Sequence, residues 1–409
     1  MLRRVLLIAA STLELIRYIS KVKHNTNKKT NLSKKAFTMG KYIRMFDTEA
    51  EYSQASKINP SVDWVVETDR VAYNPYHDYS KDYLTFVVTT GGNIGFSGST
   101  STNTLSFSKD NGETWNTADS ATTIPVSEGD RILWKGTAAP QSYKGIGKFS
   151  GDTTARYSIE GNAMSLLFGD DFKNQTSLEG KNYALYYLFG GNTNVTSAEN
   201  MSLPATTLAQ SCYEYMFYGC TSLTTAPSIL PATTLASSCY GRMFSGCTSL
   251  TTAPELPATT LAQSCYEYMF NGCTSLTAAP ELPATTLANS SYSSMFQGCS
   301  SLTTSPELPA TTLVDRCYQS MFAGCTSLTT APELPATTLA SSCYRSMFQG
   351  CRSLNSITCL ATDISASNCT KYWLNNVAAS GTFTKAASMT SWTTGDNGIP
   401  RGWTVIDKE

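Results

Sequence analysis

Few residues of this chain have the types and spacing that acid–base or nucleophilic chemistry requires. The chain has only two histidines, His24 in a basic leader and His77 in a segment rich in tyrosine, so a histidine general base is not expected. Asp170 and Asp171 are adjacent carboxylates, but adjacency alone does not make a catalytic pair, and we expect a loop or a cap there. No serine-hydrolase, zinc-protease or phosphate-binding motif occurs in the sequence. These residues predict a protein that is not an enzyme.

One string, residues 108–115, reads S-K-D-N-G-E-T-W and fits the Asp-box pattern found in sialidases. In that pattern the aspartate, here Asp110, accepts backbone N–H bonds in a hairpin turn, while the tryptophan, here Trp115, packs behind it. A sialidase propeller needs several such boxes, and this chain has one. We therefore expect a structural hairpin, with glycan hydrolysis by residues 80–165 as the alternative.

All thirteen cysteines lie between Cys212 and Cys369. Five repeats place a second cysteine eight residues after the first, but the fourth has Ser291 at the first position, which would leave Cys299 unpaired in an obligatory intra-repeat disulfide. No C-x-x-C pair occurs and histidines are scarce, so neither a metal site nor a cofactor is predicted. We expect a ladder of small buried side chains, with disulfides between repeats as the alternative.

These cysteines belong to a string that is written six times between Leu203 and Leu354. Each copy reads close to L-P-A-T-T-L-A-x-S-C-Y-x-x-M-F-x-G-C-T-S-L-T-T-A-P-E, and the step between copies is 27 residues once and 26 residues thereafter. A fixed period of this size predicts a solenoid, in which each unit buries its apolar face against its neighbours. Residues 187–195 and 360–377 echo the string imperfectly, as terminal caps do, and we align Trp373 with Phe348.

Within one repeat, the spacing of the apolar residues predicts a short helix followed by a strand. Five apolar residues fall at i, i+4, i+5, i+8 and i+9, which is one face of a helix of about two to three turns: Leu208, Cys212, Tyr213, Met216 and Phe217. Gly219 would end this helix in a left-handed conformation. Residues 223–226 predict a strand, and the strands of successive repeats would form a parallel sheet.

The string M-F-x-G-C-T-S-L-T-T, with L-P after it, resembles the BspA-like leucine-rich repeats of bacterial surface proteins. The resemblance covers about residues 166–377, with Met216 and its equivalents in place of the usual alanine. The tail, residues 381–404, is similar to tails on such proteins from gut bacteria and their phages, and residues 46–52 and 71–75 resemble lead segments of phage and prophage structural proteins. The resemblance implies an α/β leucine-rich-repeat solenoid of six repeats plus caps, and adhesion or recognition rather than chemistry.

The chain divides by composition into five parts. Residues 1–38 are a basic leader, which we interpret as a signal peptide, a basic arm or a spurious extension upstream of Met39. Residues 39–79 are a lead-in or attachment segment. Alternating apolar runs separated by turn residues predict a small all-β, sandwich-like domain over residues 80–165. The repeat region with its caps spans residues 166–377, and residues 378–409 predict a β element that closes the stack.

Charge and the differences between copies bear on the partner. The six copies contain four arginines and no lysine, which argues against nucleic acid, and no segment is long enough to span a membrane. Two positions after each Cys-Tyr pair and one after each Met-Phe pair vary, and we expect them to be solvated. Either these positions drift neutrally or they form a contact surface, whose candidate residues are Tyr215, Tyr218, Arg242, Tyr268, Gln319 and Arg345.

A protein that recognises a host or bacterial surface protein or a glycan fits these observations. A ladder of threonines at Thr224, Thr225 and their equivalents is a further candidate for a glycan, although threonine is also a good strand residue. The expected location is the cell surface or the extracellular space, or alternatively a virion. The sequence carries no signal for an oligomeric state.

Overall fold

The computed structural model describes residues 77–100 and 104–408, together with five short strands nearer the N-terminus. It divides into two compact units, Met1–Asp78 and Tyr79–Glu409. In the first unit β1 (Leu7–Ile8), β3 (Tyr42–Met45) and β2 (Ala36–Met39) form an antiparallel sheet in that order, and β4 (Val65–Glu67) pairs with β5 (Arg70–Ala72). Most of the leader and of the lead-in segment, with the predictions made for them, lies outside the described residues.

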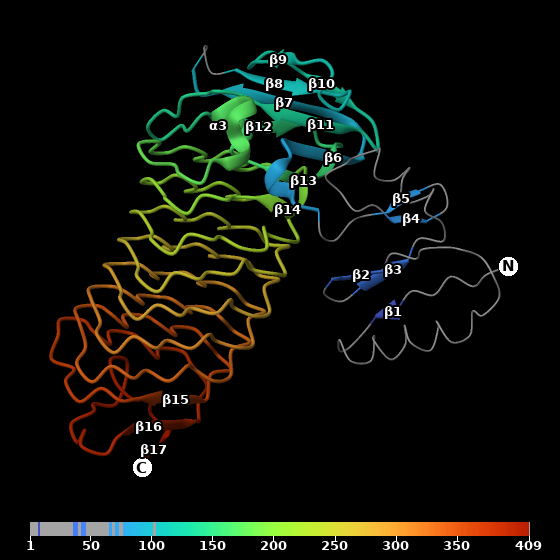
Figure 1. Cartoon of the computed structure of the whole chain (residues 1–409). Helices are drawn as coiled ribbons and strands as arrows, with labels where there is room; N and C mark the ends of the chain where they lie inside the picture. The colour runs from blue at the N-terminus through green and yellow to red at the C-terminus, as the bar shows by residue number, and fades with distance from the viewer. Residues whose placement is uncertain are drawn as a thin grey trace. The chain divides into compact units, whose positions relative to one another are not determined.

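The first part of the second unit consists of two sheets (Figure 1), of which the smaller is antiparallel and the larger is antiparallel except at one edge strand. After the 3₁₀ helix η1 (Tyr79–Lys81), the chain forms eight strands. Their bounds are β6 (Leu84–Thr90), β7 (Gly92–Gly98), β8 (Leu105–Ser108), β9 (Asn116–Ala118), β10 (Ile124–Val126), β11 (Arg131–Lys135), β12 (Gly147–Gly151) and β13 (Arg156–Asn162).

Aromatic rings from both sheets meet in the core. The smaller sheet has the order β10-β7-β12, and the larger has the order β14-β13-β6-β11-β8-β9. Phe149 of the smaller sheet lies 4.8 Å from Phe86 and 4.8 Å from Trp134 of the larger sheet, measured between ring centroids. All three side chains are buried, so these contacts join the sheets through apolar burial.

The larger sheet continues into the repeat region. The chain leaves β13 through α3 (Ser165–Phe168) and η2 (Gly169–Asn174) and then enters β14 (Val195–Ser202), which pairs with β13 in parallel. Phe189, in the first imperfect repeat, stacks on Phe149 at 5.3 Å and on Phe217 at 5.1 Å. The predicted boundary between residues 165 and 166 therefore falls inside α3, and the sheet and the core continue across it.

The helix predicted in each repeat is wrong. Within residues 104–408 the structure has one α-helix, α3, and the predicted helix is replaced by a continuous run of turns. Every fourth residue of this run has a left-handed backbone, as Ser211 (φ 54°), Tyr215 (φ 60°) and Gly219 (φ 68°) show in the second coil. A left-handed residue cannot continue a right-handed helix. We call this segment the turn ribbon; in the second coil it spans residues 209–220.

Hydrogen bonds in the turn ribbon alternate between its own coil and the next. The Met216 N–H donates to the Tyr213 carbonyl within the ribbon, whereas the Tyr215 N–H donates to the Gly241 carbonyl of the next coil. Equivalent bonds recur in every later copy. Alternate backbone N–H groups of the ribbon thus donate within their own coil and to the next coil. The bonds between coils hold the coils in register (Figure 1).

The strand predicted at residues 223–226 is reduced to a single bridged residue. Thr225 pairs in parallel with Ser197 before it and with Thr252 after it, and a second file of single bridges joins Thr207 to Thr234. Phenylalanines stack along the core with neighbouring ring centroids 5.1–5.7 Å apart: Phe189, Phe217, Phe244, Phe270, Phe296, Phe322 and Phe348.

The C-terminal end of the stack is a parallel sheet of β15 (Ser356–Cys359), β16 (Thr382–Ala386) and β17 (Thr404–Lys408). Trp373 stacks on Tyr344 at 6.2 Å and on Trp392 at 5.4 Å. The alignment of Trp373 with Phe348 is wrong by one residue. The Phe348 N–H donates to the Trp373 carbonyl, as the Phe217 N–H does to the methionine before the next phenylalanine, so Trp373 occupies the methionine position.

Candidate recognition surface

One position of the turn ribbon combines an unusual backbone with large variation between copies. It is the second residue after each Cys-Tyr pair, and its φ lies between 53° and 60° in all eight coils. We call it the left-handed column: Tyr187, Tyr215, Arg242, Tyr268, Ser294, Ser320, Ser346 and Tyr372. Bulky side chains are rare at such φ values. The column is nevertheless bulky in its first four members and serine in the next three.

Arg242 lies between two tyrosine rings of the left-handed column. Its guanidinium carbon is 5.4 Å from the centre of the Tyr215 ring and 4.6 Å from the centre of the Tyr268 ring. Both distances are within the range of cation–π attraction. Arg242 Nη1 lies 3.9 Å from Glu214 Oε1, which is an ion pair but too long for a hydrogen bond. Among the described residues the guanidinium makes no hydrogen bond.

Further tyrosines extend this group toward the β sheets. Tyr215 lies 5.4 Å from Tyr218 and 5.5 Å from Tyr186, measured between ring centroids. Tyr186 continues to Tyr183 at 5.7 Å, and Tyr183 to Tyr143 at 4.8 Å. We call the connected set the tyrosine–arginine patch: Tyr143, Tyr183, Tyr186, Tyr187, Tyr215, Tyr218, Arg242 and Tyr268.

Burial shifts the titration of several groups in and beside the patch. Burial raises the pKa of Tyr186 to about 12, with the nearby Glu214 carboxylate as a smaller cause. Burial also raises the pKa of Glu214, although a hydrogen bond from Ser211 and the charge of Arg242 act in the opposite direction. Tyr186 therefore stays a neutral hydroxyl group at physiological pH.

The structure brings together four of the six residues predicted as ligand contacts. Tyr215, Tyr218, Arg242 and Tyr268 share the patch, whereas Gln319 and Arg345 lie in later coils, and no described contact joins them to it. Solvation of the variable positions was predicted throughout, and this is wrong at five of them, which are buried: Gly241, Ser245, Ser293, Ser294 and Ala323. Neighbouring coils pack closely enough to cover short side chains at these positions.

The sequence prediction missed Tyr143, Tyr183, Tyr186 and Tyr187. Tyr187 could have been found, because the first imperfect unit aligns Tyr187 with Tyr215, and the Tyr187 N–H bond to the Glu214 carbonyl confirms that alignment. Tyr143 is on a tight loop before β12, in which Gln141 and Gly145 exchange backbone hydrogen bonds. No repeat pattern could have placed that loop beside the first coil.

The sequence of these coils matches a protein-family model. Residues 192–329 and 242–375 match the model described as "BspA type Leucine rich repeat region (6 copies)". The chain carries a BspA-type leucine-rich repeat region. No curated protein matches the chain, and no solved structure does. Among the residues that the structure describes, none belongs to a helix with the length and hydropathy needed to cross a bilayer.

The cysteines of the BspA-type repeats are packing residues. All thirteen are free and buried. In each Gly-Cys pair the thiol points at the carbonyl of a phenylalanine one coil earlier, as Cys273 Sγ does at 3.1 Å from the Phe244 oxygen. Burial raises the pKa of the Cys273 thiol well above its usual value, so the reactive thiolate form is disfavoured. The described residues contain no group of His, Cys, Asp or Glu that could hold a metal ion.

Several threonines of the BspA-type repeats donate hydrogen bonds from their hydroxyl groups to backbone carbonyls of the preceding coil. Thr251 Oγ1 donates to the Thr224 carbonyl at 3.0 Å, and Thr224 Oγ1 donates to the Thr196 carbonyl at 2.8 Å. The side chains remain exposed. Because the hydroxyl hydrogen atoms of Thr224 and Thr251 are already donated, these two hydroxyls can offer a glycan little more than a lone pair.

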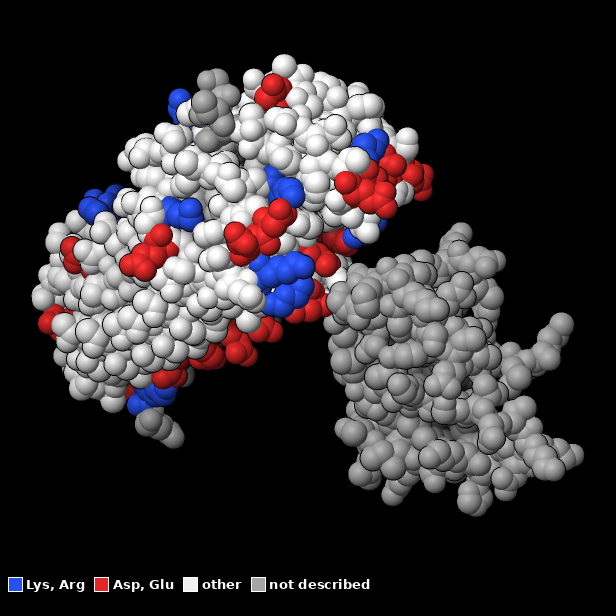
Figure 2. Space-filling model, turned by 45° about the horizontal axis from the view of Figure 1, so that its top comes forward, with Lys and Arg blue, Asp and Glu red and all other residues white. Residues whose placement is uncertain are grey.

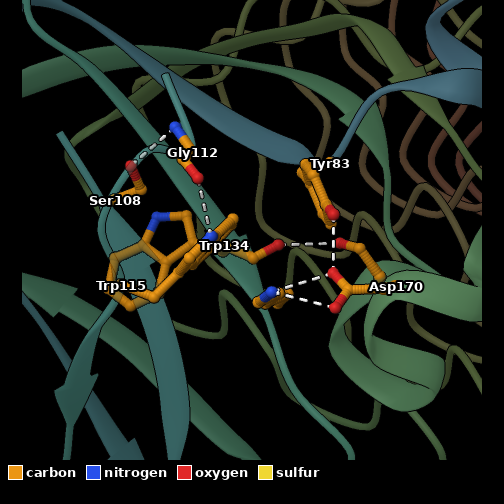
Figure 3. A network of polar contacts seen from close by, with 8 residues as sticks. Tyr83, Ser108, Gly112, Trp115, Trp134 and Asp170 are labelled. Carbon is orange, nitrogen blue, oxygen red and sulfur yellow. Dashed lines mark hydrogen bonds and ion pairs between the residues drawn. The ribbon is translucent and has the colours of Figure 1, made fainter. Parts of the chain in front are cut away.

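The Asp-box string forms a hairpin turn between β8 and β9 (Figure 3). Asp110 Oδ1 accepts a hydrogen bond from the Thr114 N–H at 2.9 Å, and the Trp115 indole donates to the Gly112 carbonyl at 3.1 Å. Hydrogen bonds from Thr114 and Ser108 lower the pKa of Asp110 to about 2. The hydrogen bonds that the Asp110 carboxylate accepts come from residues of the turn itself, Ser108 and Thr114. This is what a structural role of the motif requires.

Asp170 is tied to a tyrosine and a lysine rather than to Asp171. The Tyr83 hydroxyl donates to Asp170 Oδ1 at 2.6 Å, and Lys135 Nζ lies 2.8 Å from the same oxygen (Figure 3). Lys135 also lies 4.2 Å from the centre of the Trp115 ring. The hydrogen bond from Lys135 is the main cause that lowers the pKa of Asp170. This cluster joins η2 to the β sheets, and it holds its carboxylate ionised in a structural contact.

Proposed function

We propose that this chain is a non-enzymatic recognition protein that acts at a surface and binds a macromolecule through the tyrosine–arginine patch. We also propose the finer fold: a solenoid of six full BspA-type units between imperfect end units, preceded by a small sandwich-like β domain. The family is consistent with protein binding at surfaces. The face seen in Figure 2 is largely neutral, with charged side chains in small groups, which fits neither a nucleic-acid nor a strongly acidic partner.

The observation that carries this proposal is the position of Arg242. Any residue other than glycine at positive φ bears a cost of order 1–3 kcal/mol, and the same column accepts serine at Ser294, Ser320 and Ser346. Neither the backbone nor the packing therefore demands a ring or a guanidinium at Tyr215, Arg242 and Tyr268. Tyrosine and arginine are also the side chains that dominate binding energy at interfaces.

The proposal is tested by measuring attachment of the fluorescently labelled full chain to a panel of bacterial and mammalian cells. Arg242→Gln removes the charge from the patch. Arg316→Gln is the matched control, because Arg316 also has a left-handed backbone (φ 56°) and is exposed, but it has no described ring contact. We expect attachment to fall at least about tenfold in the first variant only. Attachment to no cell, or equal attachment by both variants, would rule out the patch as the binding site.

Location at a cell surface or in the extracellular space is our first proposal, and a virion is the second. The second rests on the resemblance of residues 46–52 and 71–75 to phage lead segments, which lies outside the described residues apart from Val71 and Ala72. The N-terminal sequence of the protein from its natural source discriminates the two. Cleavage near residue 20 supports export, and a start at Met39 supports the virion.

A further inference from the structure

The surface around Arg242 lacks the aliphatic side chains on which protein interfaces rely. At three positions of each coil, namely the left-handed column, the residue before it and the residue three after it, the large side chains are at least partly exposed, whereas short ones such as Ser294 and Ala323 are buried. Across eight coils these positions hold tyrosine, serine, glycine, glutamate, glutamine, asparagine, arginine, lysine and one alanine, but no leucine, isoleucine, valine, methionine, phenylalanine or tryptophan. The centre of a protein–protein interface is more apolar than that. Tyrosine rings are the only large apolar surfaces at these positions.

The polar groups beside the patch are mixed donors and acceptors. Arg242 keeps its guanidinium N–H groups free of hydrogen bonds among the described residues, and Glu214 and Glu267 precede the tyrosines on either side of it. Lys148 lies 5.8 Å from the centre of the Tyr187 ring. Two cations and two carboxylates thus lie in or beside the patch, and the formal charges of these four residues cancel. A hydroxyl both donates and accepts, and neighbouring hydroxyls of one sugar can satisfy an arginine and a carboxylate together.

Two rings of the patch are open to a ligand. Tyr218 is 40% exposed and Tyr143 is 72% exposed. A tyrosine ring offers an apolar face and a polar tip, which suits the C–H face of a sugar ring with its hydroxyls at the rim. The other tyrosines support these two, because Tyr215 contacts Tyr218 edge to face and Tyr183 contacts Tyr143.

The patch is elongated along the stack. Tyr187, Tyr215, Arg242 and Tyr268 belong to four successive coils joined by backbone hydrogen bonds, and such bonding spaces neighbouring chains about 4.8 Å apart. A ligand that follows the first four members of the left-handed column meets a tyrosine or an arginine at each step. A chain of several units fits this row better than a single small molecule does.

We propose that the tyrosine–arginine patch binds an extended stretch of a neutral glycan that lies along the left-handed column. This inference rests on the proposed function and names the chemical class of its ligand. The recognition uses Tyr218 and Tyr143 as platforms, with Arg242 and the flanking glutamates as hydrogen-bonding groups for sugar hydroxyls.

A printed array of neutral and acidic glycans, probed with the full chain, tests the ligand class. Tyr218→Ala removes one platform. Tyr372→Ala is the matched control, because Tyr372 belongs to the left-handed column and is 38% exposed but lies in the last coil. We expect retention on neutral glycans that falls at least about tenfold in Tyr218→Ala and is unchanged in Tyr372→Ala. Retention on acidic glycans only, or on no glycan, would overturn the inference.

The cell-attachment assay separates this inference from the proposed function. Cells are treated either with periodate, which cleaves the vicinal diols of sugars, or with a broad protease before the chain is added. We expect periodate to abolish attachment and protease to spare it. Attachment that is lost after protease and kept after periodate would overturn the glycan inference while leaving recognition by the patch intact, whereas no attachment to untreated cells contradicts the proposed function itself.

Discussion

At the scale of single residues, the chain is organised by left-handed positions rather than by helix-forming ones. Ser320, for example, has a φ of 55° in a ribbon whose hydrogen bonds are made by the backbone. Because the ribbon bonds through main-chain atoms, side chains in the left-handed column can change without changing the fold. This explains how tyrosine, arginine and serine can occupy equivalent places.

The left-handed backbone predicts an unusual order of stabilities at Ser320. Ser320→Gly should raise the free energy of unfolding by about 1 kcal/mol, because glycine adopts positive φ without the steric cost of a Cβ. Ser320→Val should lower it, because a branched Cβ clashes most at such φ. Urea denaturation of the three proteins measures the order, and a valine variant as stable as the serine protein would contradict the assigned backbone.

Glu214 predicts a pH dependence. Burial raises its pKa in the folded state, so the folded protein binds this proton more readily than the unfolded chain, and ionisation at higher pH costs stability. Glu214→Gln should therefore be more stable than the parent at neutral pH. The difference should shrink as pH falls through the raised pKa of Glu214, and it should be absent below the ordinary glutamate pKa of about 4.3. Thermal melts at several pH values check this, and a variant less stable at neutral pH would count against it.

At the scale of elements, the turn ribbon shows why the sequence predicted a helix. The buried residues Cys212, Tyr213, Met216 and Phe217 recur with a period of four, which is close to the 3.6 of an α-helix. Over one short segment the two periods place the same residues on the buried face. The prediction of the core was therefore right, while the backbone that carries it was not predictable from apolar spacing alone.

Interactions between coils decide that this segment forms a turn ribbon rather than a helix. Nothing within one repeat shows that the Tyr215 N–H will bond to the Gly241 carbonyl 26 residues later. A better clue was the recurrence of serine and glycine four residues apart, seen at Ser342 and Gly350 with Ser346 between them. Small or polar residues at that spacing tolerate left-handed backbones better than most residues do.

The buried cysteines predict that redox conditions do not affect stability. All thirteen thiols are free, so a reducing agent should leave the melting temperature unchanged. A thiol reagent should titrate thirteen groups in denaturant but react slowly with the folded protein, since burial disfavours the thiolate. A melting temperature that drops on reduction, or fewer thiols in denaturant, would instead indicate disulfides between coils.

At the scale of the whole second unit, the β sheets and the repeats share one framework. β14 completes the larger sheet, and the phenylalanine stack begins at Phe149 and passes through Phe189 into the coils. The sequence predicted strands before the repeats and caps at both ends. It could not predict that the two regions merge, because β13 and β14 are separated by a segment with no strand pattern.

Phe189 is the residue that tests this continuity. Phe189→Ala should lower the free energy of unfolding by about 3–5 kcal/mol, because it leaves a cavity in a fully buried stack. It should also separate the unfolding of the sheets from that of the coils. Near-UV circular dichroism from the aromatic core and far-UV circular dichroism should give coincident transitions in the parent and distinct ones in the variant. Phe296→Ala, within the stack, is the control, and equal uncoupling by both would contradict a special junction.

The most direct test of recognition by the patch is the affinity of the Arg242→Lys variant for cells that bind the parent chain. Lysine keeps the charge but loses the planar group that lies between Tyr215 and Tyr268. We predict binding at least about tenfold weaker, with Arg316→Lys binding as the parent does. Parent-like binding by Arg242→Lys, or equal loss in both variants, would contradict the patch as the site of recognition.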